Sequence, residues 1–536
     1  MTVVPNGSPG AQPPESFKRA AWLLFLSLFV LYHLNLSNLD EGDAVPSVNL
    51  PVALLATGRL SFDPERFPEM FKWRSLPPLV EREDFFFLDW NTVFAERTAR
   101  EWQSLGKLQF NGPRYYVVQS PNHRGYVSTF GPLPGLAILP FVAPFYAIDH
   151  GLHTKLGLRA SVAKLGCASM VAACAVLIFL IAVRRTTRPL ALLVAAVYGV
   201  GTCAWAVSSQ NIWQQTVNQL LLALGAFFVL GRIDRRRVAV FAGLALGAAT
   251  ACRATGVIVL AATLAHLAIY QRKSTVPFLL GALPVPMAIA AYNFYYFGSP
   301  FSLAQELIGH AIAEQKTGSS ALWQTPLYEG ALGLLVSPSR GLLVFSPVLG
   351  PAFWGVVQTF RDPRWHVLRP LSGAAIVMMA VQCKWFDWWG GHAYGYRPWL
   401  DAVPYLVLSL LPIAENLTKT PARRMAFGAL FAWSVFVQAL GALTYDRSWN
   451  LRQLFVVRVP GVLEPIGLFS EPEARLYAEA RQGSYLGPSF CDIDYPFCRF
   501  RLWSLKDNMI LYQLDHFEET RSRRLPMDFS DLERRH

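Results

Sequence analysis

The chain has 536 residues, of which 53% are hydrophobic and only 16% are charged, and its mean hydropathy is +0.29. Soluble domains usually carry about 25% charged residues, and the apolar residues here come in blocks of about 17–25, the length that spans a hydrocarbon core, so a soluble protein is excluded. The net charge of +12 comes from short Lys and Arg clusters between apolar blocks, as in cytoplasmic loops, and no basic surface interleaved with aromatic residues indicates nucleic-acid binding.

The apolar blocks predict an all-α polytopic membrane protein with about eleven to twelve transmembrane helices. Residues 1–19 are rich in Pro, Gly and Ser and are expected to be a disordered cytoplasmic amino terminus. Residues 20–445 would form the transmembrane domain, with a first outer loop at 39–133, and residues 446–536 would form a small outer carboxyl-terminal tail. The predicted spans are 20–38, 161–183, 189–207, 214–231, 238–251, 255–271, 276–297, 331–359, 370–385, 398–413 and 425–445.

The first block is expected to be a retained span and not a removed signal peptide, because no small-x-small cleavage site follows it. The segment 134–150 is short and contains three prolines, and we expect it to dip into the membrane without crossing. Every strong basic cluster then falls on one side, which is cytoplasmic, with the amino terminus inside and the carboxyl terminus outside. In the first outer loop, two β-rich runs around Asn122–Gly125 predict a hairpin.

Three carboxylates follow the first span directly, in the sequence LDEGDAVPS: Asp40, Glu41 and Asp43. Such a cluster at a membrane surface can take a proton from an acceptor hydroxyl or bind a cation. The alternative is a solvated helix end without a function.

The sequence after Asp43 is DAVPSVNLPVALLATGRLSFD, an amphipathic stretch that reaches Gly58. It resembles the first outer loop of GT-C glycosyltransferases, the polyprenyl-phosphate-sugar-dependent group that includes protein mannosyltransferases and the aminoarabinose transferase of lipid A. Four other pieces resemble a bacterial branch of that superfamily: YVSTFGPLPGLAILP, NFYYFGSPFSLA, SPSRGLLVFSPVLG and WWGGHAYGYRPWLDAVPYL. The carboxyl-terminal tail lies outside the resemblance. The resemblance implies that Asp43 is the family's acidic catalytic residue, which takes the proton of the acceptor hydroxyl, with Asp40 or Glu41 as the fallback.

A lipid phosphate near the membrane surface needs fixed cations, and three arginines are candidates. Arg253 in ACRATG lies at an expected outer turn where the family often has Lys or Arg, and Arg397 in YGYRPW matches the family's RY-type motif. Arg340 in SPSRG would be half-buried and must find a partner. The alternative for each is a snorkelling residue at a span end or a structural ion pair.

Aromatic and amide side chains that could bind a sugar occur at two expected outer turns. Trp213 and Gln214 lie in SSQNIWQQTVNQ, where many relatives of the family carry an acidic residue and this chain has none. His392 lies in the turn FDWWGGHAYGYR, although an interfacial aromatic belt explains the two tryptophans of this turn better than sugar binding does. Glu306 and His310 would share a helix face, but two ligands are too few to predict a metal site.

Five of the seven cysteines lie in or beside apolar blocks, where cysteine acts as a small hydrophobic residue. Cys491 and Cys498 bracket CDIDYPFC in the polar tail, with no nearby group to complete a zinc site. We expect a local disulfide between them if the tail faces an oxidising compartment.

The resemblance implies an inverting glycosyltransferase of the bacterial plasma (inner) membrane, with its site on the outer face. Its donor would be a polyprenyl-phosphate-sugar, and its acceptor a glycan, a lipid or a protein of the cell envelope. No cofactor is indicated, and a divalent cation is left open. The alternative is a transporter or lipid flippase that uses the same arginines as a path. An acyltransferase or glycan polymerase would need a catalytic histidine, for which His392 and His310 are the candidates.

Overall fold

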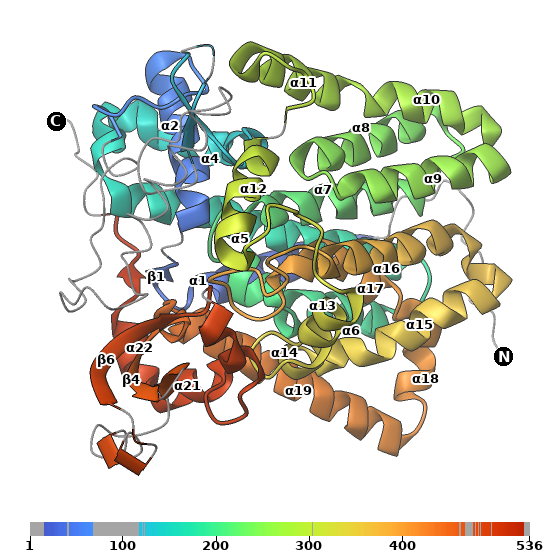
Figure 1. Cartoon of the computed structure of the whole chain (residues 1–536). Helices are drawn as coiled ribbons and strands as arrows, with labels where there is room; N and C mark the ends of the chain where they lie inside the picture. The colour runs from blue at the N-terminus through green and yellow to red at the C-terminus, as the bar shows by residue number, and fades with distance from the viewer. Residues whose placement is uncertain are drawn as a thin grey trace.

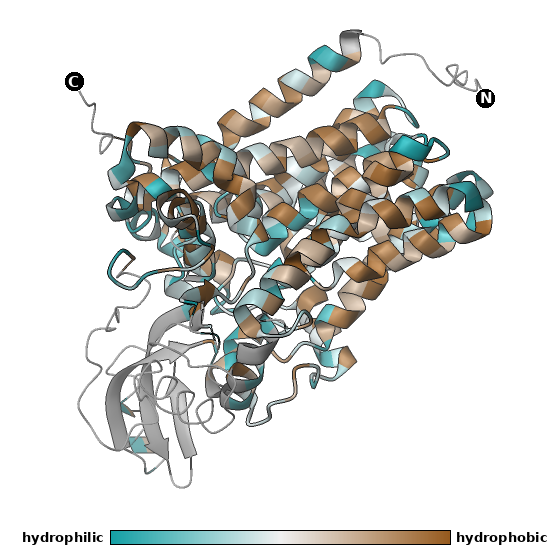
Figure 2. Ribbon diagram, turned by 90° about the horizontal axis from the view of Figure 1, so that it is seen from above, coloured by the Kyte–Doolittle hydropathy of each residue, from teal (hydrophilic) through white to brown (hydrophobic). Residues whose placement is uncertain are grey.

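The computed structural model describes residues 15–39, 42–67, 117–120, 122, 124–302, 304–459, 462–466, 475–476, 479–480, 482, 484–494 and 496–529. Most of these residues lie in helices, which form an elongated bundle with a small β-containing unit at one end (Figure 1). Figure 2 shows hydrophobic residues along the helices and hydrophilic residues gathered at the loops.

The chain enters the bundle through α1 (Glu15–His33), so residues 15–19, the last five of the segment expected to be disordered, are helical, and residues 1–14 lie outside the described part. Large apolar side chains of α1 are exposed, for example Trp22 at 66% and Leu23 at 64%. In water this surface would be unfavourable, whereas facing lipid tails it is not.

After α1, the strand β1 (Ser37–Asn38) and the 3-10 helix η1 (Gly42–Ala44) lead into α2 (Val45–Thr57). The helix α2 ends at Gly58, whose φ of 68° lies in the left-handed region that glycine adopts without strain. The predicted helix between Asp43 and Gly58 is therefore present.

The predicted hairpin is confirmed: β2 (Val117–Gln119) pairs antiparallel with β3 (Tyr126–Ser128). The segment 134–150 forms α4 (Leu133–Ile148), which packs against α2. Both helices lie together at one end of the bundle in Figure 1, and the prediction that 134–150 does not cross the membrane stays a prediction.

The remaining helices and short helical turns complete the bundle. They are η3 (His150–Thr154), α5 (Leu156–Ala182), α6 (Arg188–Gly201), η4 (Ala204–Ser208), α7 (Gln214–Val229), α8 (Arg236–Cys252), α9 (Gly256–Tyr270), α10 (Arg272–Ala282), α11 (Pro284–Phe297), α12 (Ala304–Thr317), α13 (Leu327–Val336), α14 (Leu342–Phe345), η5 (Pro347–Leu349), α15 (Gly350–Arg361), η6 (Pro363–Leu368), α16 (Arg369–Cys383), η7 (Arg397–Ala402), α17 (Val403–Leu408), η8 (Leu411–Ile413), α18 (Ala414–Thr418) and α19 (Pro421–Thr444).

Within the described residues, five helical stretches are long and apolar enough to cross a membrane. They correspond to five of the predicted spans, and the number eleven to twelve is not confirmed because the other apolar helices are shorter. The five stretches are Leu156–Ala182, Arg272–Phe297, Pro363–Cys383, Arg397–Thr418 and Pro421–Thr444.

The prediction of one span at 331–359 is wrong. The chain there is broken into α13, α14, η5 and α15, and the breaks fall at Pro338 and Pro347. Proline has no backbone N–H to donate and disfavours helical geometry in the residue before it. A hydropathy average over the block does not register these breaks.

The carboxyl-terminal tail is not all-α. It contains a three-stranded antiparallel sheet in the order β5-β4-β6, whose strands are β4 (Leu451–Val459), β5 (Val462–Ile466) and β6 (Ser484–Asp492). The short helices η9 (Ser448–Asn450), η10 (Pro496–Trp503), α21 (Met509–Asp515) and α22 (Phe517–Ser522) follow the bundle or the sheet, and β7 (Leu525–Pro526) ends the described chain's secondary structure.

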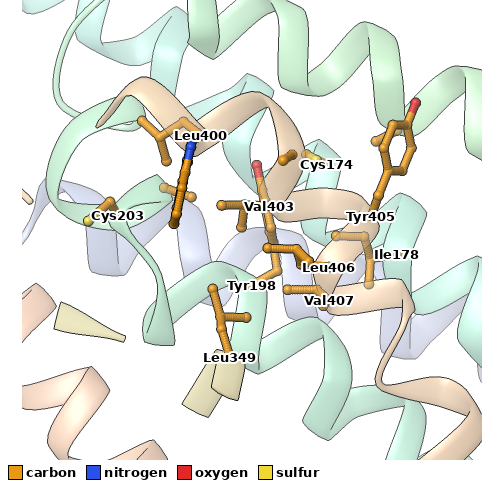
Figure 3. Close-up of a cluster of buried hydrophobic side chains, with 14 of the residues drawn as sticks. Cys174, Ile178, Tyr198, Cys203, Leu349, Leu400, Val403, Tyr405, Leu406 and Val407 are labelled. Carbon is orange, nitrogen blue, oxygen red and sulfur yellow. The ribbon is translucent and has the colours of Figure 1, made fainter. Parts of the chain in front are cut away.

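A buried core joins α5, α6, α7 and the segment η7–α17. The close-up in Figure 3 shows the part of it that α5, α6 and η7–α17 contribute, with Cys174, Tyr198 and Val403 labelled. The hydroxyl of Tyr405 donates to the carbonyl of Leu222, and that of Tyr198 donates to Gln219. Each buried hydroxyl therefore has a partner, and the core fixes η7 against α7. The candidate site lies where these two elements begin.

Candidate functional site

Asp43 lies in η1, directly before α2, and contacts Arg397 at the start of η7. The guanidinium Nη1 of Arg397 donates to Oδ2 of Asp43 at 2.9 Å. The side chains are 21% and 13% exposed, so the pair is half-buried but reachable from solvent. The structure thus brings together the acid and one of the arginines that the sequence singled out.

Arg397 is held by two further groups. Its Nη2 donates to the carbonyl of Gly390 at 2.7 Å, and its guanidinium carbon lies 4.3 Å from the centroid of the Trp213 ring. Trp213 is the residue before α7, and it is buried, with its Nε1 making no hydrogen bond in the described structure. A guanidinium fixed by an acid, a carbonyl and an aromatic face keeps its orientation before any ligand arrives.

Gln214 begins α7, next to Trp213. Its Nε2 donates to the carbonyl of Phe130 at 2.7 Å, which ties α7 to the turn between the hairpin and α4. The amide therefore has a structural partner in this state, and its predicted contact with a sugar stays a prediction.

Arg253 lies between α8 and α9 and forms an ion pair with Asp401 at 2.9 Å. Asp401 is on η7, four residues after Arg397, and its side chain is 4% exposed. The short helix η7 thus carries Arg397 and also the partner of Arg253, so both predicted phosphate ligands are positioned by the same element.

Asp401, which sequence reasoning missed, has polar neighbours. The amide of Asn218 on α7 and the hydroxyl of Thr255 lie beside this pair without a hydrogen bond of good geometry among the described residues. Thr255, Gln382 and Asp401 line a narrow gap between α16 and η7 next to them. The signal in the sequence was the spacing of Asp401 from Arg397, within RPWLD.

Arg340 is fully buried in the break after α13. Its guanidinium donates to the carbonyls of Trp389 at 2.9 Å and Gly391 at 3.1 Å, and to Oδ1 of Asn450 at 2.9 Å. These contacts hold the turn 386–397, which presents Arg397, against the carboxyl-terminal region. In this state they favour the structural alternative over contact with a substrate.

His392 lies in the same turn, and its Nε2 is 3.9 Å from Oδ2 of Asp494 in the carboxyl-terminal region. The indole of Trp389 donates to the other oxygen of Asp494 at 3.0 Å. Burial lowers the pKa of the Arg499 guanidinium, which lies 4.2 Å from the Trp389 ring. The turn and the carboxyl-terminal region therefore form one polar contact at the outer edge of the site.

Several predicted residues lie outside what the structure describes: Asp40, Glu41 and the side chains of Glu306 and Cys491. Nδ1 of His310 lies 2.7 Å from the carbonyl oxygen of Ser320. Among the described residues, no group of three or more His, Cys, Asp or Glu side chains could hold a metal ion.

The cysteines in the described part of the chain are of two kinds. Cys498 is disulfide-bonded, and the five cysteines of the bundle are buried and free: Cys167, Cys174, Cys203, Cys252 and Cys383.

Comparison with known proteins adds no further assignment. No protein-family model matches the chain, and no curated protein is significantly similar to it.

Proposed function

We propose that this chain is a membrane glycosyltransferase that moves a sugar from a polyprenyl-phosphate carrier to an acceptor hydroxyl on the outer face of a bacterial plasma membrane. The observation that carries the proposal is the ion pair of Asp43 and Arg397, at 2.9 Å, beside the face of Trp213. The carboxylate, directly before α2, suits an acceptor hydroxyl that must lose a proton. The guanidinium, at the start of η7, suits the phosphate leaving group.

The leaving group of such a donor is a lipid phosphate whose negative charge grows as the bond to the sugar breaks. Arg397 would bind this phosphate through its fork of N–H donors, and Arg253 on the other side of η7 would add a second cation. Both guanidinium groups are already neutralised by carboxylates, so phosphate binding is an exchange of one anion for another. This exchange avoids leaving a desolvated cation without a partner in the empty site.

The exchange has a consequence for Asp43. When Arg397 turns to the phosphate, the carboxylate of Asp43 is released to accept the proton of the acceptor hydroxyl. The hydroxyl oxygen then attacks the anomeric carbon, the bond from that carbon to the phosphate oxygen breaks, and the phosphate leaves with the electron pair. One displacement of this kind inverts the anomeric carbon. A divalent cation stays open, and no step depends on one.

The experiment compares cell-surface glycans, lipids and proteins by mass spectrometry in cells that lack the gene and in cells complemented with the wild type or with Asp43→Asn. The control is Asp63→Asn, because Asp63 is an exposed carboxylate of the same loop whose contact with the N–H of Glu65 an amide oxygen can replace. We expect one sugar modification to disappear without the gene, to return with the wild type and the control, and to stay absent with Asp43→Asn.

If no sugar modification depends on the gene, the transferase proposal is wrong. If the modification depends on the gene but Asp43→Asn restores it, the transferase survives and the base is another residue. Accumulation of an intact lipid on one side of the membrane, without any transfer product, would instead indicate the transporter or flippase.

A further inference from the structure

The end of the described chain returns to the segment that carries Asp43. In what we call the strap, residues 524–529, β7 pairs antiparallel with β1, so that Leu525 lies opposite Asn38. The N–H of Met527 donates to the carbonyl of Leu36 at 2.9 Å. The strap therefore adds a strand to the short linker between α1 and η1.

Arg524 anchors the strap. It is 6% exposed, and its Nε donates to the hydroxyl of Ser37 at 2.8 Å. Its Nη1 donates to the carbonyl of Tyr445 at 3.1 Å, at the end of α19, and its Nη2 to Oε1 of Gln210 at 3.4 Å. One guanidinium thus joins the strap to the linker, to the last bundle helix and to the segment before α7.

The linker is also fixed from the bundle side. Lys164 of α5 is fully buried, and its ammonium donates to Oδ1 of Asn35 and to the carbonyl of Ser37, both at 2.5 Å. Asn211 donates through its amide to the carbonyl of Leu39 at 2.6 Å. Contacts from α5, from the segment before α7 and from the strap therefore meet on residues 35–39.

This linker ends only a few residues before Asp43, and the segment before α7 that Arg524 also contacts continues into Trp213. A fixed linker limits where η1 and its carboxylate can lie relative to Arg397. A buried cation that donates several hydrogen bonds keeps its partners in one arrangement, because moving them leaves a desolvated charge without partners.

We propose that the strap is a positioning device for the Asp43 segment, and that Arg524 is its positioning residue. The consequence for sugar transfer rests on the proposed function, whereas the consequence for the conformation of residues 36–48 does not. The role needs the planar fork of arginine, since three acceptors on three elements are contacted from different nitrogen atoms.

The conformational test is hydrogen–deuterium exchange with mass spectrometry on the full chain in lipid nanodiscs. Arg524→Gln should raise exchange in peptides that cover residues 36–48 and leave peptides of α8 and α9 unchanged. The matched control is Arg521→Ala, an exposed arginine of α22 in the same region, which should exchange like the wild type. Unchanged exchange of residues 36–48 in Arg524→Gln would overturn the proposal.

The functional test separates turnover from donor binding. Arg524→Gln should lower turnover by about 10–100-fold, the effect of a reacting group displaced by about an ångström, while the affinity for farnesyl phosphate stays within about threefold of the wild type. Arg524→Lys should restore only part of the turnover. If exchange rises as expected but the wild type transfers no sugar, the proposed function fails and the strap remains; if the wild type is active and Arg524→Gln is equally active, the positioning role is wrong.

Discussion

The carboxylate of Asp43 accepts a hydrogen bond from the guanidinium of Arg397 at 2.9 Å, although 354 positions separate the two residues in the chain. The contact links η1, in the segment after α1, to the start of η7. An acid that neutralises a phosphate-binding arginine in the empty site keeps that arginine charged and oriented until an anion replaces it. The first two predictions follow from this exchange.

Replacing Arg397 by alanine should weaken the binding of a lipid phosphate. The loss of a hydrogen bond between two charged groups amounts to about 1.5–3 kcal/mol, which is roughly a 10- to 150-fold rise in Kd. Titration of the purified chain with farnesyl phosphate measures it. Arg364→Ala serves as the control, because Arg364 is 86% exposed in the loop between α15 and α16. An unchanged Kd in Arg397→Ala would remove Arg397 from the donor site.

Replacing Asp43 by asparagine should lower turnover without weakening donor binding. Turnover should fall about 10²–10⁴-fold, the usual contribution of a general base, because an amide takes no proton. Farnesyl phosphate should bind as tightly as before or more tightly, because Arg397 no longer has to break an ion pair with Asp43 in order to contact the phosphate. Asp40→Asn and Glu41→Gln should be milder. If Asp40→Asn abolishes transfer and Asp43→Asn does not, the base lies three residues earlier than proposed.

The ion pair of Arg253 and Asp401 predicts a strong coupling in stability. Arg253→Met leaves the buried carboxylate of Asp401 without its cation and should cost about 3–5 kcal/mol of unfolding free energy. The double variant Arg253→Met/Asp401→Leu removes both charges and should recover most of that loss. Thermal unfolding in detergent, with the wild type and both single variants, measures the coupling. Additive effects in the double variant would show that the two residues do not depend on each other.

The sequence was informative where local chemistry decides the structure. The hairpin around Asn122–Gly125 is present, and the helix that ends at Gly58 is present because glycine adopts a left-handed turn there. The resemblance to GT-C glycosyltransferases selected Asp43 and Arg397 separately. It could not pair them, because their contact depends on how the helices pack and not on any local pattern.

The predictions that were wrong or missing concern features that a local pattern does not reveal. The break near Pro338 was missed because an apolar average hides single prolines. In the tail, β4 and β5 pair locally across two residues, and only the pairing of β4 with β6 joins segments far apart in the chain, which no local pattern indicates. Asp401 was passed over since a lone acid at a span end looks solvated until its partner is seen. Arg524 and Lys164 gave no sequence signal, because a buried cation is recognised only by the elements that surround it.

The disulfide prediction concerns material made by the native export route. Cys498 is disulfide-bonded, so alkylation before reduction should leave it unmodified, while denaturation should expose the free cysteines of the bundle, for example Cys174. Peptide mapping under non-reducing conditions should find Cys498 linked to Cys491. A Cys498 thiol that is alkylated without reduction would show that the carboxyl-terminal region does not meet an oxidising compartment.

The last prediction concerns sidedness. The carboxyl-terminal region lies at the opposite end of the bundle from the start of α8 in Figure 1, and the basic run Arg235–Arg237 spans the N-cap and the first two residues of α8. Since Lys and Arg are retained on the cytoplasmic side, a reporter inserted next to Arg236 should read as inside and one fused after His536 as outside. A third reporter next to Arg423, in the first turn of α19, should agree with the first. If the reporters at Arg236 and His536 report the same side, the chain crosses the membrane an even number of times between them, and the eleven-span model is wrong. If they report opposite sides but with the basic run outside, the proposed outer location of Asp43 is wrong as well, because η1 and the carboxyl-terminal strand β7 are joined through β1 and must share one side.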